Sequence, residues 1–553
     1  MSGLRPVDAM LEILRDEGIR KVFGNPGTSE LPFVDALVGR PEFEFVLGLH
    51  EGSVVAMADG YARATGRPSF VSLHIAAGLA NGLVGLLNAS RSRTPMVVTA
   101  GQQDRRHLVS DPLLSGDLVG LAQAAVKQTF DVQHAHDLPI LLRRAFALAA
   151  QPPAGPVFLS IPMDLLQEDG LVDVPGKSAI APLGVPGDLS RAVSLLAGAR
   201  HPVVVAGDGV GRDDAVAELV ALAESIGASV YHQPMNDGVN FPGSHPLHAG
   251  GLTPTNQAIR ERLARHDVVF IVGCHAFMAH HYTPGPAVPE TADVVQLDSD
   301  ATEIGRNFTV AVGLVGGIRA TLDELTRQLR GRVPEAAQRA RIAGMHAKTR
   351  DVDIETIALS RWGDSPLDPL AAVHAVVTGL PENAVVVEEA ITSGVLLRSV
   401  LRQDRPRSLV HTLGGGLGWG VGAAIGSRMG DPSRPVVAVL GDGCTMFGLQ
   451  GLWSAARHGV PVTFVVMNNG EYRTLKDTLD RWDSRATRTG AYVGLDLGPP
   501  RLDFTAAAEF FGIEAVRAES TDHLAQLVTK GAASDTPLLI DVPITGHQTR
   551  ETT

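Results

Sequence analysis

Two short apolar runs in the C-terminal third, each ending in polar residues, constrain the fold of this chain most strongly. Val436–Leu440 leads into Gly441-Asp442-Gly443, and Val462–Met467 leads into Asn468-Asn469. Both runs are rich in valine and lack polar alternation, which is typical of strands buried on both faces of a parallel sheet. The stretch between them, 449–458, has helical composition. The sequence therefore predicts a strand–helix–strand unit with Asp and Asn at the carboxyl edge of a sheet.

The polar residues at that edge have the chemistry of a Mg²⁺–diphosphate site. Open α/β sheets bind ligands at the carboxyl ends of their strands. Asp442 and Asn469 offer hard oxygen ligands, and Gly441 and Gly443 allow the main chain to approach a diphosphate closely. Mg²⁺ prefers a few protein oxygens together with phosphate oxygens. We therefore predict that these residues bind a diphosphate through Mg²⁺.

A second Gly-Asp-Gly triplet, Gly207–Gly209, follows the predicted strand Pro202–Ala206. It has no Asn-Asn pair at a matching distance, and only Asn236 stands near the corresponding place. Because glycine supplies turn geometry without any ligand, we interpret this copy as a tight strand-to-helix turn. The stretch Gly207–Gly211 is only weakly compatible with a nucleotide site, and we expect no FAD.

Charge, cysteine content and hydropathy exclude several classes of protein. The 553-residue chain has a formal net charge of −13 and no basic stripe, which argues against nucleic-acid binding. Its two cysteines, Cys274 and Cys444, form no disulfide framework and fit a reducing compartment. Cys444 follows the motif directly, so a catalytic thiol is an alternative, although no neighbouring histidines support it. Because no apolar run approaches the ~20 residues that span a bilayer, and no signal peptide is evident, we expect a soluble cytoplasmic protein without a membrane partner.

Alternating strands and helices divide the chain into three α/β blocks, 1–180, 189–340 and 366–545. The stretches 167–188 and 330–369, rich in Gly, Pro and charged residues, are interpreted as linkers. The pattern predicts three doubly wound parallel-sheet domains. Strands are expected at 21–24, 43–49, 69–73, 96–99, 157–161, 202–206, 228–231, 268–272, 294–297 and 537–542.

Three further groups of residues in the first block are candidates for catalysis. Glu51 follows the predicted strand 43–49, Thr28 lies in a Pro/Gly turn, and His74 follows the predicted strand 69–73. Each has an ordinary structural interpretation by itself: a partner of the helix dipole, a helix cap and a structural histidine, respectively. Their presence together with the diphosphate motif favours the functional interpretation.

With these motifs in place, the chain resembles the thiamine-diphosphate-dependent superfamily of 2-oxo acid decarboxylases and acetohydroxyacid synthases. Within it, the sequence is most similar to the benzoylformate decarboxylases. The segments that carry the resemblance are spread over all three blocks: 23–33, 50–62, 73–78, 99–103, 280–285, 415–418 and 466–470. The resemblance implies three domains of this enzyme type, which bind the pyrimidine ring, form the middle of the chain and bind the diphosphate.

The resemblance also implies roles for individual residues. Asp442, Asn469 and the main-chain carbonyl of Glu471 would bind Mg²⁺, and Glu51 would hydrogen-bond the pyrimidine ring of the cofactor. Gly415 would accept a hydrogen bond from the cofactor through its carbonyl, and Leu417 would support its bent shape. The further cofactor-binding positions are Gly441, Gly443 and Thr392. Because Glu51 and the diphosphate site come from different subunits in this superfamily, we expect at least a homodimer and, by the same resemblance, a homotetramer.

His74 and His280 match the two active-site histidines of the benzoylformate decarboxylases. Imidazoles titrate near neutral pH, so they can serve the proton transfers that decarboxylation requires. This pair favours a decarboxylase over an acetolactate-forming synthase. Thr28 stands where the family has a serine that contacts the substrate carboxylate; its hydroxyl is kept, and its extra methyl narrows the pocket.

The segment after Tyr472 departs from the family. Arg473 and Lys476 add charge, and Thr478 replaces an aromatic residue, so a polar or differently shaped substrate is an alternative to a phenyl-bearing one. The expected activity is that of a carboxy-lyase, the non-oxidative decarboxylation of an aromatic, benzoylformate-like 2-oxo acid. The alternatives are a carboligase or lyase acting on 2-hydroxyketones, an acyl-CoA-linked or acetolactate-synthase-like relative, and a cofactor-binding protein without catalysis.

Overall fold

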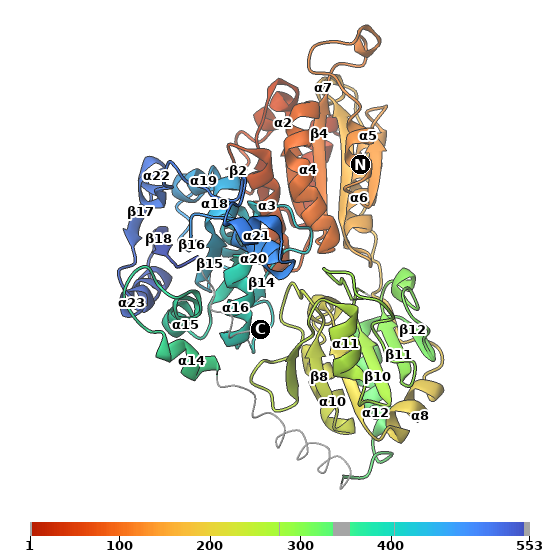
Figure 1. The fold of residues 1–553 in the computed structure, drawn as a ribbon. Coiled ribbons are helices and arrows are strands. Elements are labelled where there is room, and N and C mark those ends of the chain that lie inside the picture. The colour runs from red at the N-terminus through yellow and green to blue at the C-terminus, as the bar shows by residue number, and fades with distance from the viewer. Residues whose placement is uncertain (1–2, 276, 336–353, 403, 547–553) are drawn as a thin grey trace. The chain divides into compact units, whose positions relative to one another are not determined.

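The computed structural model describes residues 3–275, 277–335, 354–402 and 404–546, and it contains three six-stranded sheets flanked by helices (Figure 1). All strand pairs whose register the structure describes are parallel, for example Val436 opposite Val462. This architecture confirms the predicted α/β class with three parallel sheets. Contact density divides the chain into two compact units. The first comprises Met1–Ala179, Glu355–Val400 and Val410–Thr553, and the second comprises Ile180–Ile354 and Leu401–Leu409.

The first sheet has the strand order β2-β1-β3-β4-β6-β5. Its strands are β1 (Lys21–Gly24), β2 (Glu44–Leu47), β3 (Ser69–Leu73), β4 (Met96–Gln102), β5 (Gln128–Asp131) and β6 (Pro156–Pro162). The helices around it are α1 (Pro6–Asp16), η1 (Thr28–Glu30), α2 (Leu31–Ala36), α3 (Glu51–Thr65), α4 (Ile75–Arg91), η2 (Leu108–Ser110), α5 (Leu118–Gln123), α6 (Asp137–Ala150) and α7 (Met163–Gln167).

The third sheet, in the same compact unit, has the order β14-β13-β15-β16-β18-β17. Its strands are β13 (Val385–Glu389), β14 (Leu409–Val410), β15 (Val436–Gly441), β16 (Val462–Asn468), β17 (Glu514–Arg517) and β18 (Leu538–Pro543). Its helices are α14 (Ile354–Ser360), α15 (Pro369–Gly379), α16 (Thr392–Val400), α17 (Trp419–Gly430), α18 (Asp442–Phe447), α19 (Gly451–Arg457), α20 (Arg473–Arg481), α21 (Arg485–Thr489), α22 (Phe504–Phe510) and α23 (Thr521–Ala532).

The second unit contains a sheet of order β12-β11-β10-β7-β8-β9. Its strands are β7 (Pro202–Ala206), β8 (Ser229–His232), β9 (His248–Gly251), β10 (Val268–Val272), β11 (Asp293–Asp298) and β12 (Val312–Val315). Its helices are α8 (Ser190–Gly198), α9 (Asp208–Arg212), α10 (Val216–Ile226), α11 (Asn256–Leu263), η3 (Ala301–Glu303) and α12 (Ile318–Leu329).

The second Gly-Asp-Gly triplet is a strand-to-helix turn, as predicted, because β7 ends at Ala206 and α9 begins at Asp208. The buried Asp208 carboxylate accepts hydrogen bonds from the side chains of Gln233 (2.5 Å) and Asn240 (2.8 Å). Burial, together with the neighbouring charge of Asp237, raises the pKa of Asp208 to about 7. Protein groups therefore satisfy this carboxylate without any ligand.

Apart from the edge strand β2, the apolar runs predicted as strands are largely buried, and the missed strands lie at sheet edges except for the buried central strand β13. All residues of β7 and β10 are buried, as are all but the last residues of β15 and β16. The edge strands β5, β12 and β17 carry mostly exposed or half-buried residues. A strand that covers no core face needs no apolar run, so its sequence resembles that of a loop.

The predicted domain boundaries remain predictions. No helix or strand is described between α7 and α8, where the first linker was expected. The second predicted linker, 330–369, falls partly on residues 336–353, outside the described residues. Within the parts of the chain that the structure describes, no helix is both long and apolar enough to cross a membrane.

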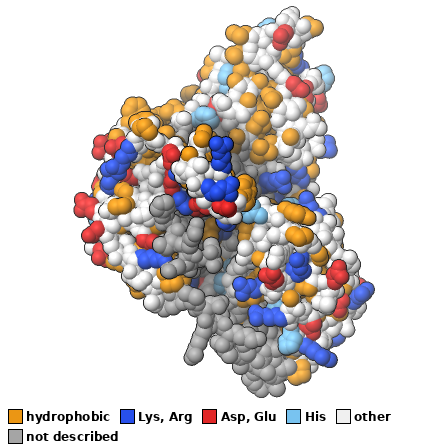
Figure 2. Space-filling view, in the orientation of Figure 1, with side chains coloured by type: hydrophobic (Ala, Val, Ile, Leu, Met, Phe, Trp, Pro, Cys, Tyr) orange, Lys and Arg blue, Asp and Glu red, His pale blue; other side chains and the backbone are white. Residues whose placement is uncertain are grey.

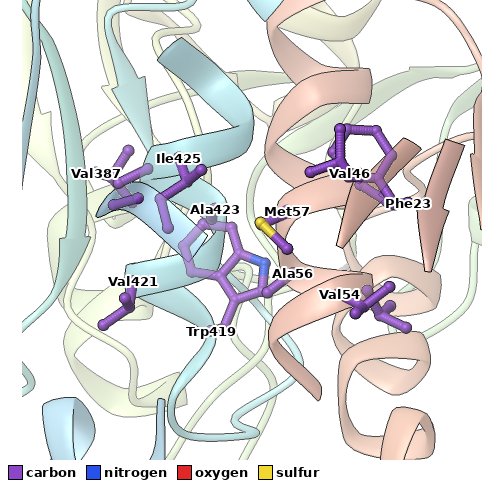
Figure 3. Packing of buried hydrophobic residues seen from close by; sticks show 14 of the residues in the cluster. Phe23, Val46, Val54, Ala56, Met57, Val387, Trp419, Val421, Ala423 and Ile425 are labelled. Carbon is purple, nitrogen blue, oxygen red and sulfur yellow. The ribbon is translucent and has the colours of Figure 1, made fainter. Parts of the chain in front are cut away.

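Close packing between α3 and α17 joins the first and third sheets. Glycines allow the backbones to touch: a Cβ added to Gly60 would lie 2.0 Å from the carbonyl oxygen of Ala423, and one added to Gly426 would lie 1.8 Å from that of Met57. Figure 3 shows the Trp419 indole lying between the two helices, beside Ala56 and Met57.

A polar anchor fixes the orientation of this helix pair. The Trp419 indole N–H donates to Oδ2 of the fully buried Asp59 (2.7 Å). Oδ1 of Asp59 accepts from Thr94 Oγ1 (2.6 Å) and Arg63 Nε (2.9 Å). Three donors from different elements therefore satisfy one buried carboxylate, which offsets the cost of its burial.

We expect Gly426→Ala to lower the free energy of unfolding by about 1–3 kcal/mol, because the added methyl forces α17 away from α3. Chemical denaturation would measure this loss. Gly198→Ala is the matched control: Gly198 lies in α8 with nothing within 4 Å of an added Cβ, so alanine should stabilise that helix slightly. Equal effects of the two substitutions would contradict the close-packing interpretation.

Candidate functional site

The carboxyl ends of β15 and β16 bring the two halves of the predicted diphosphate motif together. Asp442 is the first residue of α18, and its Oδ2 accepts hydrogen bonds from the backbone N–H groups of Asn469 (3.1 Å) and Gly470 (2.7 Å). Its Oδ1 accepts from the N–H of Gly443 (2.7 Å). Burial raises the pKa of Asp442 above its ordinary value, although these three donors favour the charged carboxylate.

The loop after β16 turns tightly at Gly470, where φ is +67°. Oδ1 of Asn469 accepts from the N–H of Glu471 (3.0 Å), and the N–H of Tyr472 donates to the carbonyl of Leu495 (2.8 Å). Glu471 also faces Asp496 across an isolated antiparallel bridge. The loop is therefore held on one side by Asp442 and on the other by the segment around 496.

The residues at this edge fit a Mg²⁺ ion that carries a diphosphate. Asp442, Asn469 and the carbonyl of Glu471 are hard oxygen donors of the kind Mg²⁺ prefers. Within the described residues, no three His, Cys, Asp or Glu side chains form a metal-binding group. The predicted set instead contains one carboxylate, one amide and one main-chain carbonyl, so phosphate oxygens would have to complete the coordination.

A cavity of about 400 Å³ lies beside the Asn469 loop. This volume lies in the range of small-molecule sites, about 300–1,000 Å³. Residues from the loop after β16 and from the segment before α22 line it: Asn468, Asn469, Gly470, Leu497, Gly498, Pro499, Arg501 and Leu502. The outer side of the loop is therefore open to a molecule of moderate size.

The glycine-rich loop before α17 contains two of the predicted cofactor contacts. Gly415 has a φ of +73°, and Leu417 is half-buried. Asn88 of α4 holds the loop with two hydrogen bonds, from its Nδ2 to the carbonyl of Gly416 (2.9 Å) and from the N–H of Gly416 to its Oδ1 (3.0 Å). Thr392 is the first residue of α16.

Two buried carboxylates at the end of β13, Glu388 and Glu389, were not selected from the sequence. Glu389 accepts hydrogen bonds from the N–H groups of Trp419 (3.3 Å) and Gly420 (2.8 Å) at the start of α17, and burial raises its pKa to about 8. Burial disfavours the charge on Glu388 as well, but its ion pairs with His411 and Arg398 outweigh that effect and hold its pKa well below the usual range. Two acidic residues ending an apolar strand were the available sequence signal.

Glu51 is the first residue of α3 and is only 7% exposed. Its Oε1 accepts from Asn25 Nδ2 (3.2 Å), and its Oε2 accepts from Asn81 Nδ2 (3.0 Å). His50, rather than Glu51, caps the helix, because its Nδ1 accepts from the N–H of Gly52 (3.1 Å). A carboxylate held by two neutral amides can still bind a polar ring nitrogen of a ligand, so Glu51 fits the pyrimidine of thiamine diphosphate.

His74, at the start of α4, is oriented by a carboxylate that the sequence analysis missed. Its Nδ1 lies 2.8 Å from Oε2 of Glu30, which is 4% exposed. Glu30 also accepts from the backbone N–H groups of Gly27 (3.0 Å) and Gly101 (2.8 Å). Because Nδ1 is directed at a carboxylate, Nε2 is the ring nitrogen that can exchange a proton with a bound molecule. The sequence signal was an acidic residue two positions after Thr28.

The Thr28 segment lies directly against His74. Thr28 begins η1 between Gly27 and Ser29. Ser29 Oγ lies 3.0 Å from Nδ1 of His74, and a Cβ added to Gly27 would lie 2.3 Å from the imidazole ring. Only glycine permits this contact, so the turn brings the two neighbours of Thr28, Gly27 and Ser29, against His74.

His280 lies in the second unit, where it is exposed. Its N–H donates to the carbonyl of Pro254 (2.8 Å), and its Nδ1 lies 3.2 Å from Nε2 of His281. Its role as a partner of His74 remains a prediction.

Two sequence alternatives concern the same region of the third sheet. Burial raises the pKa of the Cys444 thiol well above its ordinary value, so the thiolate that catalysis would need is disfavoured. Arg473 and Lys476 both pair with acidic residues of their own chain, Arg473 with Asp477 and Asp480, and Lys476 with Glu471 and Asp496. Burial would lower the pKa of Lys476, but these hydrogen bonds raise it, so the lysine is charged.

Three family models match the chain. They describe the N-terminal TPP-binding domain, the central domain and the C-terminal TPP-binding domain of thiamine pyrophosphate enzymes, and they match residues 5–135, 189–325 and 392–542. Together they match most of the chain and assign the two TPP-binding domains to the regions of the first and third sheets.

Related proteins and solved structures agree with these matches. The chain is 36% identical to a benzoylformate decarboxylase of Pseudomonas aeruginosa, over 97% of this chain and 98% of that protein. It is 27% identical to a probable acetolactate synthase large subunit of Methanococcus aeolicus, over 97% and 91%. Its fold is similar to that of a thiamine diphosphate-dependent 4-hydroxybenzoylformate decarboxylase of Rhodococcus jostii (TM-score 0.86, 30% identity, 99% and 100% coverage). It is also similar to that of a benzoylformate decarboxylase of Polynucleobacter necessarius (TM-score 0.87, 28% identity, 99% and 100% coverage).

Proposed function

The chain belongs to the thiamine pyrophosphate enzymes, and we propose that it catalyses the Mg²⁺-dependent, non-oxidative decarboxylation of an aromatic 2-oxo acid to an aldehyde and CO₂. The observation that carries the proposal is His74, whose Nδ1 is directed at the buried Glu30 carboxylate. The similarity to proteins named benzoylformate decarboxylase supports the substrate class.

The cofactor would be bound by residues from both TPP-binding domains. Asp442, Asn469 and the carbonyl of Glu471 would bind Mg²⁺, and Glu51 would bind the pyrimidine ring. The contacts from the other loops would come from Thr392, Gly415, Leu417, Gly441 and Gly443. We propose the predicted ranges 1–180, 189–340 and 366–545 as the three domains.

When bound, thiamine diphosphate supplies the electron sink for breaking the bond between the carboxylate and the carbonyl carbon. The protein contributes binding, orientation and proton transfer. His74 can deliver a proton from Nε2 and recover it from solvent, because the Glu30 carboxylate stabilises either protonation state through Nδ1–H. Thr28 would donate its hydroxyl hydrogen to the substrate carboxylate, and His280 would provide a second imidazole.

A carboligase remains the second candidate, since an acetolactate synthase relative matches nearly the whole chain. The same site would then join the two-carbon or aryl unit to an aldehyde or 2-oxo acid acceptor.

We also infer a cytoplasmic location, because both cysteines are free and buried. Recovery of the protein in a secreted fraction would refute this inference.

We propose that the enzyme assembles at least as a homodimer, and as a homotetramer by resemblance to the family. The argument is an apolar stripe on the exposed face of α4, with Val84 47% and Leu87 44% exposed. Figure 2 shows hydrophobic side chains gathered on this face. On the same helix, Asn81 hydrogen-bonds Glu51. Burial of such a stripe next to a catalytic carboxylate fits a subunit interface.

The activity is tested with protein reconstituted with thiamine diphosphate and Mg²⁺ and offered a panel of 2-oxo acids that includes benzoylformate. We expect release of aldehyde and CO₂ without an added acceptor. Glu51→Gln should lower kcat by about 100-fold or more, whereas Glu44→Gln, on the surface end of β2, should not. Absence of CO₂ from every acid, with product formed only when an aldehyde is added, would favour the carboligase.

The role of Glu30 is tested with a double-mutant cycle. Glu30→Gln should lower kcat by about 10- to 100-fold and alter the pH profile of kcat, because the carboxylate charge that faces Nδ1 of His74 is lost. In a His74→Gln background the same change should cost little more, since the group through which Glu30 acts is absent. Glu44→Gln, which removes a carboxylate from the exposed start of β2, is the control. Additive losses, or unchanged turnover after His74→Gln, would refute the assigned role.

Assembly is tested by measuring the molar mass in solution by light scattering. We expect a mass of two or four chains for the wild type. Val84→Glu with Leu87→Glu should produce monomers of intact secondary structure, because two charges cannot be buried in an apolar contact. Leu171→Glu, at another exposed leucine, is the control. A wild-type monomer with full activity would refute the proposed assembly.

A further inference from the structure

Lys476 lies between two carboxylates, those of Glu471 and Asp496. Glu471 belongs to the loop after β16, which carries the proposed metal ligands. Glu471 and Asp496 face each other across an antiparallel bridge, a position in which like charges destabilise the pairing. Lys476 reaches both carboxylates, Oε2 of Glu471 and Oδ1 of Asp496, from the second turn of α20. It is 7% exposed, although a lysine on a short surface helix would usually extend into solvent. One ammonium group therefore offsets the repulsion between the two carboxylates.

The bridge that Lys476 supports determines the path of the main chain at Glu471. The N–H of Leu497 donates to the carbonyl of Gly470 (2.8 Å), and the N–H of Tyr472 donates to the carbonyl of Leu495 (2.8 Å). Glu471 lies between these two hydrogen bonds, and its carbonyl belongs to the same peptide unit as the Tyr472 N–H. On the other side, Asn469 is held by Asp442 and by the N–H of Glu471. Loss of the bridge would leave the Glu471 carbonyl held from one side only.

Arg473, another basic residue of α20, has different closest partners from Lys476. Arg473 bonds to Asp477 and Asp480 of its own helix, and its closest approach to Glu471 is 3.7 Å. Asp480 is further engaged by Thr487 (2.9 Å) and Tyr492 of the next segment. Arg473 thus pairs mainly within α20, whose Asp480 contacts the α21 region, whereas Lys476 joins α20 to the loop after β16.

We propose that Lys476 is a positioning residue for Mg²⁺: by holding Glu471 opposite Asp496, it keeps the Glu471 carbonyl in the conformation that binds the ion. The inference rests on the proposed cofactor site and concerns a residue outside the predicted ligand set. It also gives Lys476 a role other than shaping the pocket for a polar substrate, the alternative that its charge had raised.

The test is a titration of MgCl₂ into the metal-free full-length protein at a fixed, saturating concentration of thiamine diphosphate, followed by tryptophan fluorescence. Lys476→Met should weaken the apparent Kd for Mg²⁺ by about 10- to 100-fold, the usual effect of removing a group that orients a metal ligand. Lys476→Arg should retain most of the affinity, because it can pair with both carboxylates. Lys530→Met, which removes an exposed lysine paired with Glu514, should leave the affinity unchanged.

The double variant Lys476→Met with Asp496→Asn separates positioning from general stabilisation. If repulsion between Glu471 and Asp496 displaces the loop, removing one of the two charges should recover a large part of the lost affinity. The melting temperatures of the variants without cofactor should then not follow the order of their Mg²⁺ affinities. Wild-type affinity in Lys476→Met, a double variant weaker than the single one, or no Mg²⁺ binding by the wild type would overturn the proposal.

This readout is independent of turnover. A protein that binds Mg²⁺ and thiamine diphosphate in a Lys476-dependent way, yet releases no CO₂ from any 2-oxo acid, would refute the proposed decarboxylase activity and leave the role of Lys476 intact. If the protein decarboxylates a 2-oxo acid but its Mg²⁺ affinity does not change in the Lys476 variants, the proposed role of Lys476 is refuted and the decarboxylase activity is supported.

Discussion

The contact between α3 and α17 is the interaction on which the first unit of the structure depends. The helices have glycine at the contact positions 60, 422 and 426, which allows their backbones to touch. The hydrogen bond between Asp59 and Trp419 fixes their orientation. Since α3 begins at Glu51 and the glycine-rich loop ends where α17 starts, this packing determines how the two TPP-binding domains of one chain are joined. Asn88, which holds that loop from α4, reinforces the same arrangement.

Buried carboxylates recur throughout the candidate site, and their partners decide what each can do. Asp442 is surrounded by backbone N–H groups, so its charge can be kept for a metal ion. Glu30 receives two backbone N–H groups and lies against His74, so it orients an imidazole. Glu388 and Glu389 are neighbours with opposite pKa directions, because His411 and Arg398 pair with Glu388, whereas burial dominates at Glu389. Chemical type alone does not distinguish these roles; the local donors do.

The sequence predicted most of the strands that form the centre of each sheet, because a strand buried on both faces must be an apolar run. The equally buried central strand β13 was missed. β7 and β10 match the predicted bounds, and the motif strands β15 and β16 differ from theirs only at the carboxyl end. Edge strands such as β5 and β17 were not predicted, because their residues are mostly exposed or half-buried and therefore need not be apolar. The motif residues Asp442 and Asn469 meet as expected, because neighbouring parallel strands end at one edge. Glu30 was missed, because its partners lie far away in the sequence at His74 and Gly101.

The sequence by itself determined the α/β class, the three sheets, the family and the motifs proposed to bind the cofactor, because these depend on local periodicity and on residues close together in the chain. Only the tertiary structure decided which charges are engaged by others. It paired Glu30 with His74, and it directed Lys476 to Glu471 and Asp496 rather than leaving it available for a substrate. Such pairings depend on how separate elements approach one another. Hydrogen bonds and ion pairs act only over a few ångströms, and the distance between two residues along the chain does not set their distance in space.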